Sequence, residues 1–266
     1  MDLSIIIVSY NTQELLRKCL ESIIDCLEKS KIKGEIIIVD NGSTDGSART
    51  VKKEFPKVKL IENKENLGFA RANNQALRQV RGEYILLLNS DTEVKPGALE
   101  SLLEFAEKHP EAGIMGAKLL NPDGSIQPSV YHFPTVWRAI KEYWLGKERE
   151  YEKYIPDGAV AVGVEAVTGA AMLVARKVIE KVGQLDNRYF MYFEDLDFCR
   201  RVRQKGFQIF YLPSAEIVHH HGASGKTIVG QTRQWLIKSS KIYNGLAKYY
   251  FLTLVIWLGW KWRGLE

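Results

Sequence analysis

Short apolar runs alternate with segments of helical periodicity through the first third of this chain. A strand that is buried on both faces is typically one continuous apolar run, and strands that alternate with helices form a parallel sheet with right-handed crossovers. The pattern predicts strands over 3–10, 35–40, 58–62 and 84–89, with helices over 13–27, 45–53 and 69–80 between them. We therefore expect an α/β fold with a mainly parallel central sheet.

The alternation continues further along the chain, although a charged and aromatic segment over 142–153 has no clear period and could be an exposed helix or a loop. The later elements that we predict are helices over 98–109, 177–182 and 194–205, and strands over 114–119, 167–175, 207–212 and 216–219. With 266 residues, of which 45% are hydrophobic, the chain can bury one large core and a smaller appended region.

Polar side chains follow the apolar runs where the predicted strands end. Asn89 and Asp91 come after the fourth strand, and Asp40 ends the second. Open α/β sheets bind ligands at the carboxyl ends of their strands. Asn89 and Asp91 could present two oxygens to Mg²⁺ or Mn²⁺, and such a cation would bridge a diphosphate. The alternative is that Asp91 or Thr92 is a helix N-cap, since Pro96 and Gly97 follow closely.

Three further segments carry groups suited to a nucleotide. Ser9 and Asn11 lie at the end of the first strand and could line the same crevice as Asp40. The carboxylate of Asp40 could accept a hydrogen bond from a base N–H or a ribose hydroxyl. Ser43 could be either a ligand group or a helix cap. Arg71, one turn into the third helix, can meet a diphosphate or a base.

Three carboxylates, Glu194, Asp195 and Asp197, crowd an aromatic segment. Aromatic neighbours raise the pKa of a carboxyl group and improve it as a base that deprotonates an acceptor hydroxyl, so one of the three is a candidate general base. The alternative is that they only favour the dipole of a helix start. His219 begins a run of three histidines before a glycine, and we interpret it as a metal ligand.

Taken in order, these segments resemble the family 2 inverting glycosyltransferases, most closely the rhamnosyltransferase-like branch. The matching motifs are IIIVSYN (5–11), IIVDNGSTDGS (37–47), NLGFARANN (66–74), LLLNSDTEVKPGAL (86–99), VTGAAMLVAR (167–176), YFEDLDFCRR (192–201) and VHHHGAS (218–224). The resemblance implies a nucleotide-sugar transferase fold of the GT-A type. The resemblance covers roughly residues 1–224 and the composition shifts after them, so we expect a catalytic domain over 1–225 followed by a C-terminal helical tail over 226–266.

The resemblance implies a donor site for a nucleotide-diphosphate sugar. Asp40 would contact the nucleobase, Arg71 would lie beside the nucleotide, and Gly169 would line the pocket for the sugar. Other residues of the motifs are assigned to substrate binding: Ser9, Asn11, Ser43, Asn74, Ser90 and Glu194. The implied acceptor is a hydroxyl of a glycan or of a lipid-linked molecule in cell-surface polysaccharide synthesis.

The resemblance also implies the metal site and the base. Asp91 would bind Mg²⁺ or Mn²⁺ with His219 as a further ligand, and Asp195 would be the base. The family has Asp-x-Asp where this chain has Asn89-x-Asp91, so Asp91 carries the metal assignment and Glu93 is a weaker candidate. A single in-line displacement follows, in which an α-linked donor gives a β linkage.

Two other functions share part of this pattern. A sugar-nucleotide pyrophosphorylase would also need a nucleotide site and a metal carboxylate, but the segment SYNTQELLRK lacks a glycine-rich and basic triphosphate loop. A membrane-docked carbohydrate-binding module without turnover is a second alternative. The presence of Asp91, Asp195 and His219 together argues against it.

The tail is basic and aromatic in a chain of net charge +5. Its basic residues, opposed only by Glu266, are Lys226, Arg233, Lys238, Lys241, Lys248, Lys261 and Arg263. Aromatic residues there are interleaved with Leu, Val and Ile, which favours a lipid surface over nucleic acid. The uncharged run over 249–260 is shorter than the roughly 20 residues that a spanning helix needs. The alternatives are a helix packed on the catalytic domain or a dimer contact.

The expected compartment is the cytoplasm, at the inner face of the cell membrane. The amino terminus enters a predicted strand at Leu3 with no charged segment or cleavage site typical of secretion. The three cysteines have no CxxC spacing, so neither a disulfide framework nor a zinc site is expected.

Overall fold

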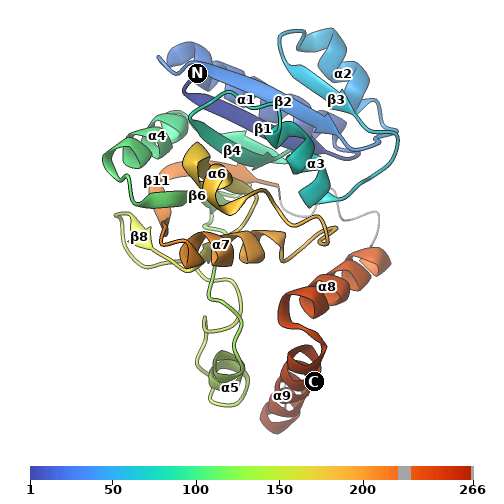
Figure 1. The fold of residues 1–266 in the computed structure, drawn as a ribbon, viewed down its shortest axis with the longest axis vertical. Coiled ribbons are helices and arrows are strands. Elements are labelled where there is room, and N and C mark those ends of the chain that lie inside the picture. The colour runs from blue at the N-terminus through green and yellow to red at the C-terminus, as the bar shows by residue number, and fades with distance from the viewer. Residues whose placement is uncertain (221–228, 265–266) are drawn as a thin grey trace.

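The structure, a computed structural model, describes residues 1–220 and 229–264 and contains a large mixed sheet with helices on both faces (Figure 1). The strand order is β3 (Lys59–Glu62), β2 (Gly34–Asp40), β1 (Leu3–Ser9), β4 (Tyr84–Asn89), β10 (Ala171–Ala175), β6 (Ala112–Leu120), β11 (Gln208–His219) and β5 (Thr92–Val94). In addition, β8 (Val162–Gly163) pairs with β11, while β7 (Val130–Tyr131) and β9 (Ala166–Val167) form a small separate sheet. The helices are α1 (Gln13–Lys29), α2 (Ser47–Glu54), α3 (Phe69–Leu77), α4 (Ala98–Lys108), α5 (Val136–Tyr143), α6 (Arg176–Val182), α7 (Glu194–Gln204), α8 (Val229–Asn244) and α9 (Leu246–Arg263).

The N-terminal half of the sheet is parallel, as predicted. Strand β1 pairs in parallel with both β2 and β4, and β2 pairs in parallel with β3. The register places Ser9 beside Asp40 and Val8 beside Asn89, so the carboxyl ends of three strands meet at one edge. The sheet is mixed because β10 runs antiparallel to both of its neighbours, β4 and β6.

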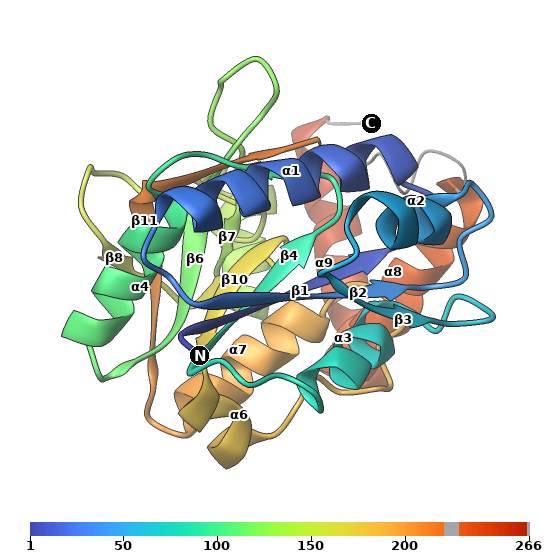
Figure 2. The same cartoon turned by 90° about the horizontal axis from the view of Figure 1, so that it is seen from above.

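The sheet is buried on both faces, which explains why its strands are apolar throughout. Successive side chains of a strand point to opposite faces, and in β1 Ile5 and Ile7 belong to one apolar cluster while Ile6 belongs to the other. The first cluster lies under α1 and α4, and the second under α3 and α7. Figure 2 shows these two pairs of helices on opposite sides of the sheet.

Some predicted elements differ from the observed ones. The strand predicted over 167–175 is interrupted at 168–170, because its first residue, Val167, pairs with β7 and its last five residues enter the large sheet as β10. The two strands predicted over 207–219 are one strand, β11, with a shift in register between Leu212 and Glu216. Pro213 lies within the shift and has no N–H to donate to a neighbouring strand. The three residues of β5 were not predicted.

The C-terminal helices α8 and α9 extend below the sheet, where α9 lies beside α5 (Figure 1). Leu252 of α9 packs with Ala139 and Tyr143, and the indole Nε1 of Trp144 donates to the carbonyl of Val255 at 2.9 Å. Of the described helices, none is long and apolar enough to cross a membrane. The predicted domain boundary after residue 225 lies outside the described residues, so this division stays a prediction.

Candidate active site

A cavity of about 390 Å³ opens at the carboxyl edge of the sheet. It is bordered by the ends of β1, β4 and β11, the first turn of α7 and one side of α8. Its lining includes six of the site residues predicted from the sequence, namely Ser90, Asp91, Gly169, Glu194, Asp195 and His219. A volume of this size is within the roughly 300–1,000 Å³ typical of ligand pockets.

Asp91 and His219 face each other in the cavity wall. The Nε2 atom of His219 lies 3.3 Å from Oδ1 of Asp91 and 3.3 Å from Nδ2 of Asn89, while Nδ1 lies 2.7 Å from Oε1 of Gln127. Strand β5 brings the pair together, because its antiparallel pairing with β11 places Thr92 opposite His219. Gln127 fixes the orientation of the imidazole ring, as groups behind a metal ligand commonly do.

Asp91 and His219 fit a divalent cation whose remaining ligands are water and phosphate oxygens. Residues 1–220 and 229–264 hold no group of three His, Cys, Asp or Glu side chains arranged to bind a metal. Asp91 and His219 would supply one oxygen and one nitrogen, and Mg²⁺-type sites typically use one or two carboxylates plus substrate phosphates. The carboxylate of Glu93 pairs with His220 and not with this site, since its Oε1 lies 2.7 Å from Nε2 of His220.

Glu194 and Asp195 are buried side by side at the start of α7, in different surroundings. The carboxylate of Asp195 accepts hydrogen bonds from the backbone N–H groups of Leu196 at 2.8 Å and Gly169 at 3.2 Å. Oε2 of Glu194 is buried and has no hydrogen-bond partner within the described parts of the chain. Burial raises the pKa of both groups, and the neighbouring Asp195 charge raises the pKa of Glu194 further.

The backbone before these carboxyls is strained. Tyr192 and Phe193 have φ values of 70° and 65°, in the left-handed region that residues with a Cβ rarely adopt. Such conformations cost about 1–2 kcal/mol per residue and concentrate at functional sites. The turn directs both Glu194 and Asp195 into the cavity.

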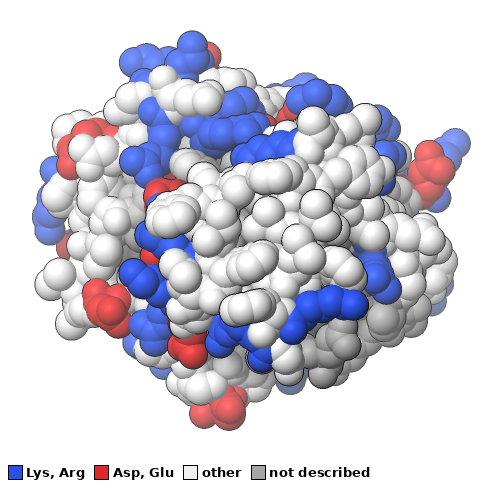
Figure 3. Space-filling model, turned by 90° about the horizontal axis from the view of Figure 1, so that it is seen from below, with Lys and Arg blue, Asp and Glu red and all other residues white. Residues whose placement is uncertain are grey.

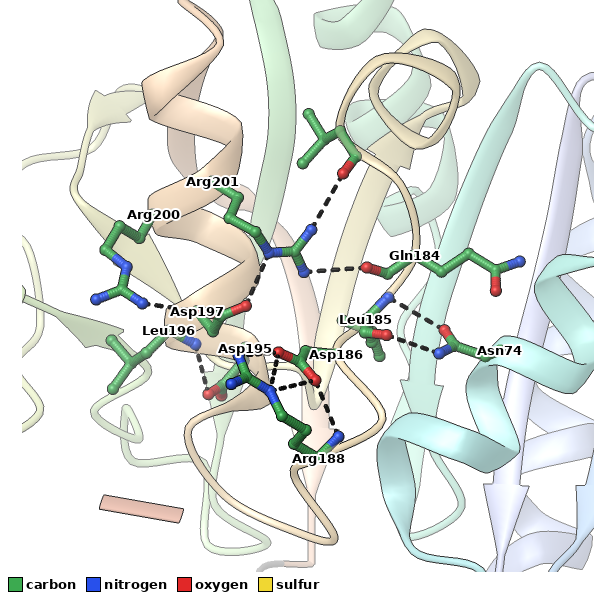
Figure 4. A network of polar contacts seen from close by, with 11 residues as sticks. Asn74, Gln184, Leu185, Asp186, Arg188, Asp195, Leu196, Asp197, Arg200 and Arg201 are labelled. Atoms are coloured by element: carbon green, nitrogen blue, oxygen red, sulfur yellow. Dashed lines mark hydrogen bonds and ion pairs between the residues drawn. The ribbon is translucent and has the colours of Figure 1, made fainter. Parts of the chain in front are cut away.

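The third carboxylate of this segment points away from the cavity. Asp197 accepts from Arg200 at 2.9 Å and from Arg201 at 2.8 Å, and Arg201 also donates to the carbonyls of Val182 and Gln184 (Figure 4). Asp197 therefore joins α7 to the segment after α6. Of the three candidate bases, the cavity contains only Glu194 and Asp195.

Other predicted ligand groups hold loops together outside the cavity lining. Ser9 is buried and hydrogen-bonds to Thr12 at 3.0 Å. Asn11 accepts from the backbone N–H of Thr44 and donates its own N–H to Ser43. Asn74 exchanges hydrogen bonds with the backbone of Leu185, which connects α3 to the segment before α7 (Figure 4).

Asp40 and Arg71 also lie outside the lining of this cavity. Oδ1 of Asp40 accepts from the backbone N–H of Ser43 at 3.0 Å, while Oδ2 is buried with no hydrogen-bond partner among the described residues. Asn41, the next residue, does line the cavity. Arg71 is exposed on α3. The nucleotide roles of Asp40 and Arg71 stay predictions.

The sequence did not single out one wall of the cavity. Lys153 and Tyr131 contribute to it, with the ammonium 5.3 Å from the ring centroid, and α8 adds Trp235 and Leu236. The positive charge of Lys153 lowers the pKa of Asp195 and offsets part of the rise caused by burial. Lys153 belongs to the segment without clear periodicity, so no sequence pattern pointed to it.

Comparison with known proteins identifies the family and the fold of this chain. A model of glycosyl transferase family 2 matches residues 4–183. The N-acetylglucosaminyl-diphospho-decaprenol L-rhamnosyltransferase of Mycobacterium tuberculosis is 30% identical over 246 residues, covering 84% of this chain and 77% of that protein. The crystal structure of GalNAc-T7 with UDP, GalNAc and Mn²⁺ is similar with a TM-score of 0.64, at 16% identity, over 82% of this chain and 44% of that one. The Pyrobaculum calidifontis mannosyltransferase with GDP-Man and Mn²⁺ has a TM-score of 0.59, at 19% identity, over 95% of this chain and 64% of that one.

The structural similarities show a shared fold, and the sequence matches show the family. The predicted α/β fold of the GT-A type is confirmed. The matches do not favour a pyrophosphorylase or a carbohydrate-binding module without turnover. This chain belongs to glycosyl transferase family 2, and its predicted resemblance to the rhamnosyltransferases of that family is confirmed.

Proposed function

We propose that this glycosyltransferase moves rhamnose from a nucleoside-diphosphate donor to a hydroxyl of a lipid-linked glycan during cell-surface polysaccharide synthesis. One observation carries the proposal: a single cavity contains both the Asp91–His219 pair and the buried Glu194–Asp195 pair. The name of the Mycobacterium tuberculosis relative supports the choice of sugar and of a diphospho-lipid acceptor. The donor nucleobase stays open.

A divalent cation, Mg²⁺ or Mn²⁺, is part of the proposal. The GalNAc-T7 and Pyrobaculum calidifontis mannosyltransferase structures both contain Mn²⁺, and Asp91 and His219 are the side chains of this chain that would hold the ion. When bound, it would offset the negative charge of the leaving nucleoside diphosphate. Gln127 would keep the His219 ring in the orientation that leaves Nε2 turned toward Asp91.

Asp195 is the proposed base. The acceptor hydroxyl would enter between Asp195 and the anomeric carbon, and the carboxylate would take its proton as the new bond forms. The N–H groups of Leu196 and Gly169 hold the carboxylate in place for this step. Attack from the face opposite the diphosphate inverts the configuration, so an α-linked donor would give a β linkage.

A transfer assay tests the proposal. The purified chain is incubated with Mn²⁺, N-acetylglucosaminyl-diphospho-polyprenol and each of several nucleotide sugars, including nucleoside-diphosphate rhamnose. We expect a rhamnosylated lipid by mass spectrometry, with inverted anomeric configuration by NMR. Transfer of a different sugar would correct the donor, whereas absence of transfer from every donor would overturn the proposed acceptor.

A further inference from the structure

Helix α9 has apolar residues on all sides, but only one side is covered in the described chain. Leu252, Val255, Ile256 and Gly259 face α5, where Leu252 is 3% exposed. The opposite side, which we call the α9 face, consists of Leu246, Tyr250, Phe251, Leu254, Trp257 and Leu258, and these side chains are 39–63% exposed. Trp262, at the end of the helix, stacks on Trp144 and is not part of this face. A helix that is apolar all round is normally buried on all sides, so the α9 face lacks a cover.

The charged residues of α8 and α9 are all of one sign. Between residues 229 and 263 the chain has no Asp or Glu and six basic residues, Arg233, Lys238, Lys241, Lys248, Lys261 and Arg263. Figure 3, which views this end of the molecule, shows a broad uncharged area with Lys and Arg around much of its margin and Asp or Glu at a few points. An apolar surface with basic edges is complementary to a membrane whose headgroups are anionic.

The kinds of aromatic residue also fit a membrane surface. Trp and Tyr have an apolar body and a polar tip, and they concentrate at the headgroup level of membranes. The α9 face carries Tyr250 and Trp257, and Lys261 lies 4.5 Å from the ring centroid of Trp257. A long basic side chain beside such a ring can extend toward the headgroups while the ring inserts.

We propose that the α9 face binds the headgroup zone of an anionic membrane, with α9 lying in the plane of the surface. A second copy of the chain is a weaker occupant, because it would bring the positive charges of its own α8 and α9 close to those of the first copy. The negative surface potential of the cytoplasmic leaflet makes it the side that this face would bind. The proposal does not require the chain to transfer a sugar.

The position of α8 gives membrane binding a consequence for the cavity. Only Gly245 separates α8 from α9, and α8 lines the cavity through Thr232, Trp235 and Leu236. Binding through α9 would hold the cavity close to the lipid surface. If the proposed function is right, a lipid-linked acceptor would reach Asp195 without leaving the membrane.

Flotation of the full chain with vesicles tests the surface, without substrate. Vesicles of phosphatidylglycerol and phosphatidylcholine should bind the chain, whereas pure phosphatidylcholine or high salt should weaken binding. Leu254→Glu, which places a carboxylate on the α9 face, should weaken binding by about tenfold or more. The matched control is Val160→Glu, at an exposed aliphatic residue outside α9, and it should bind like the unchanged chain.

Two results would overturn the proposal. Equal vesicle binding by Leu254→Glu and Val160→Glu would show that the α9 face is not the contact. A dimer that Leu254→Glu dissociates, in a chain that does not bind vesicles, would assign the face to a second copy. Unchanged transfer to a soluble acceptor by Leu254→Glu keeps this test separate from the proposed chemistry.

Discussion

Glu194 and Asp195 are adjacent buried carboxyls whose hydrogen bonds differ. Asp195 accepts from two backbone N–H groups, which stabilise its charged form, whereas Oε2 of Glu194 has no such donor within the described chain. Two interacting carboxyls titrate as a pair, and the one with more donors keeps the negative charge. Asp195 is therefore suited to be the base, with Glu194 as a protonated neighbour that can donate to a substrate oxygen.

The base is tested by Asp195→Asn. We expect turnover to fall by roughly 100-fold or more, the usual contribution of a positioned base, with nucleotide affinity retained. Steady-state kinetics and calorimetric titration with the nucleotide give the two quantities. Near-normal turnover in Asp195→Asn together with loss of activity in Glu194→Gln would assign the base to Glu194.

The raised pKa of Glu194 predicts a pH-dependent stability. The folded chain holds this proton more tightly than the unfolded chain, so the stabilising contribution is complete below pH 4.5, the ordinary Glu value, and is lost as pH rises through the folded pKa. Glu194→Gln cannot ionise and should increase the free energy of unfolding at neutral pH by on the order of 1 kcal/mol.

Urea unfolding at several pH values measures this effect. The difference between Glu194→Gln and the unchanged chain should disappear below pH 4.5. Glu28→Gln, at an exposed position of α1, is the control and should change stability little at any pH. A Glu194→Gln chain that is less stable at neutral pH would contradict the assignment.

Among the elements, the pairing of β5 with β11 assembles the proposed metal ligands. Chelation should abolish activity, Mn²⁺ or Mg²⁺ should restore it, and Asp91→Ala should have the same effect as chelation. Full activity in excess chelator would contradict the metal site.

The role of Gln127 in orienting His219 is tested by Gln127→Ala, which frees the imidazole ring. We expect the Mn²⁺ concentration for half-maximal activity to rise by about tenfold, the low end of the effect that loss of a group behind a metal ligand usually has. Gln79→Ala, exposed beyond α3, is the control.

Helix α7 depends on the Asp197 ion pairs. The side chain of Asp197 is 5% exposed, and its partners Arg200 and Arg201 are 36% and 26% exposed. Asp197→Ala leaves two partly buried guanidiniums without this carboxylate and should cost about 2–3 kcal/mol, less than breaking a fully buried pair. Asp25→Ala removes an exposed pair with Lys29 and should cost under about 1 kcal/mol. Equal losses in denaturant unfolding would show that burial does not matter here.

The sequence predicted the repetitive elements well and the irregular ones poorly. Strands β1, β2 and β4 follow from their apolar runs because both faces are buried. Segment 144–161 is held by contacts with residues outside it, such as the backbone N–H of Tyr154 with the carbonyl of Val130 at 2.9 Å and the ring of Tyr151 with that of Tyr143. Its path, and with it the position of Lys153, could therefore not be predicted. The local pattern also cannot show which way a polar side chain points.

The predicted site illustrates that last limit. Asp91, Asp195 and His219 were expected in one site, and the structure brings them into one cavity. Ser9 and Asn11 end a strand as Asp91 does, but their side chains bond to neighbouring loops instead. A motif places a residue at the edge of the sheet, whereas the packing of the next loop decides whether its side chain reaches the cavity.

At the scale of the whole molecule, donor binding should stabilise the fold. A ligand at about 100 times its Kd adds about 2.7 kcal/mol to the free energy of unfolding, which should raise Tm by several degrees. We expect this shift for the matching nucleotide sugar with Mn²⁺, and a smaller shift in Asp91→Ala. Thermal unfolding with a panel of nucleotide sugars measures it. Equal shifts for all nucleobases would contradict a specific nucleotide site.

The insertion of β10 between β4 and β6 affects the order in which the protein can mature during translation. The parallel half from β1 to β4 can form as soon as those residues leave the ribosome, but β4 then exposes an edge until β10 is made. His219 ends the last strand, 128 positions after Asp91 by their residue numbers (219 − 91). A nascent chain that lacks β11 therefore cannot assemble the proposed metal pair, and it would not consume nucleotide sugar before β11 has been made.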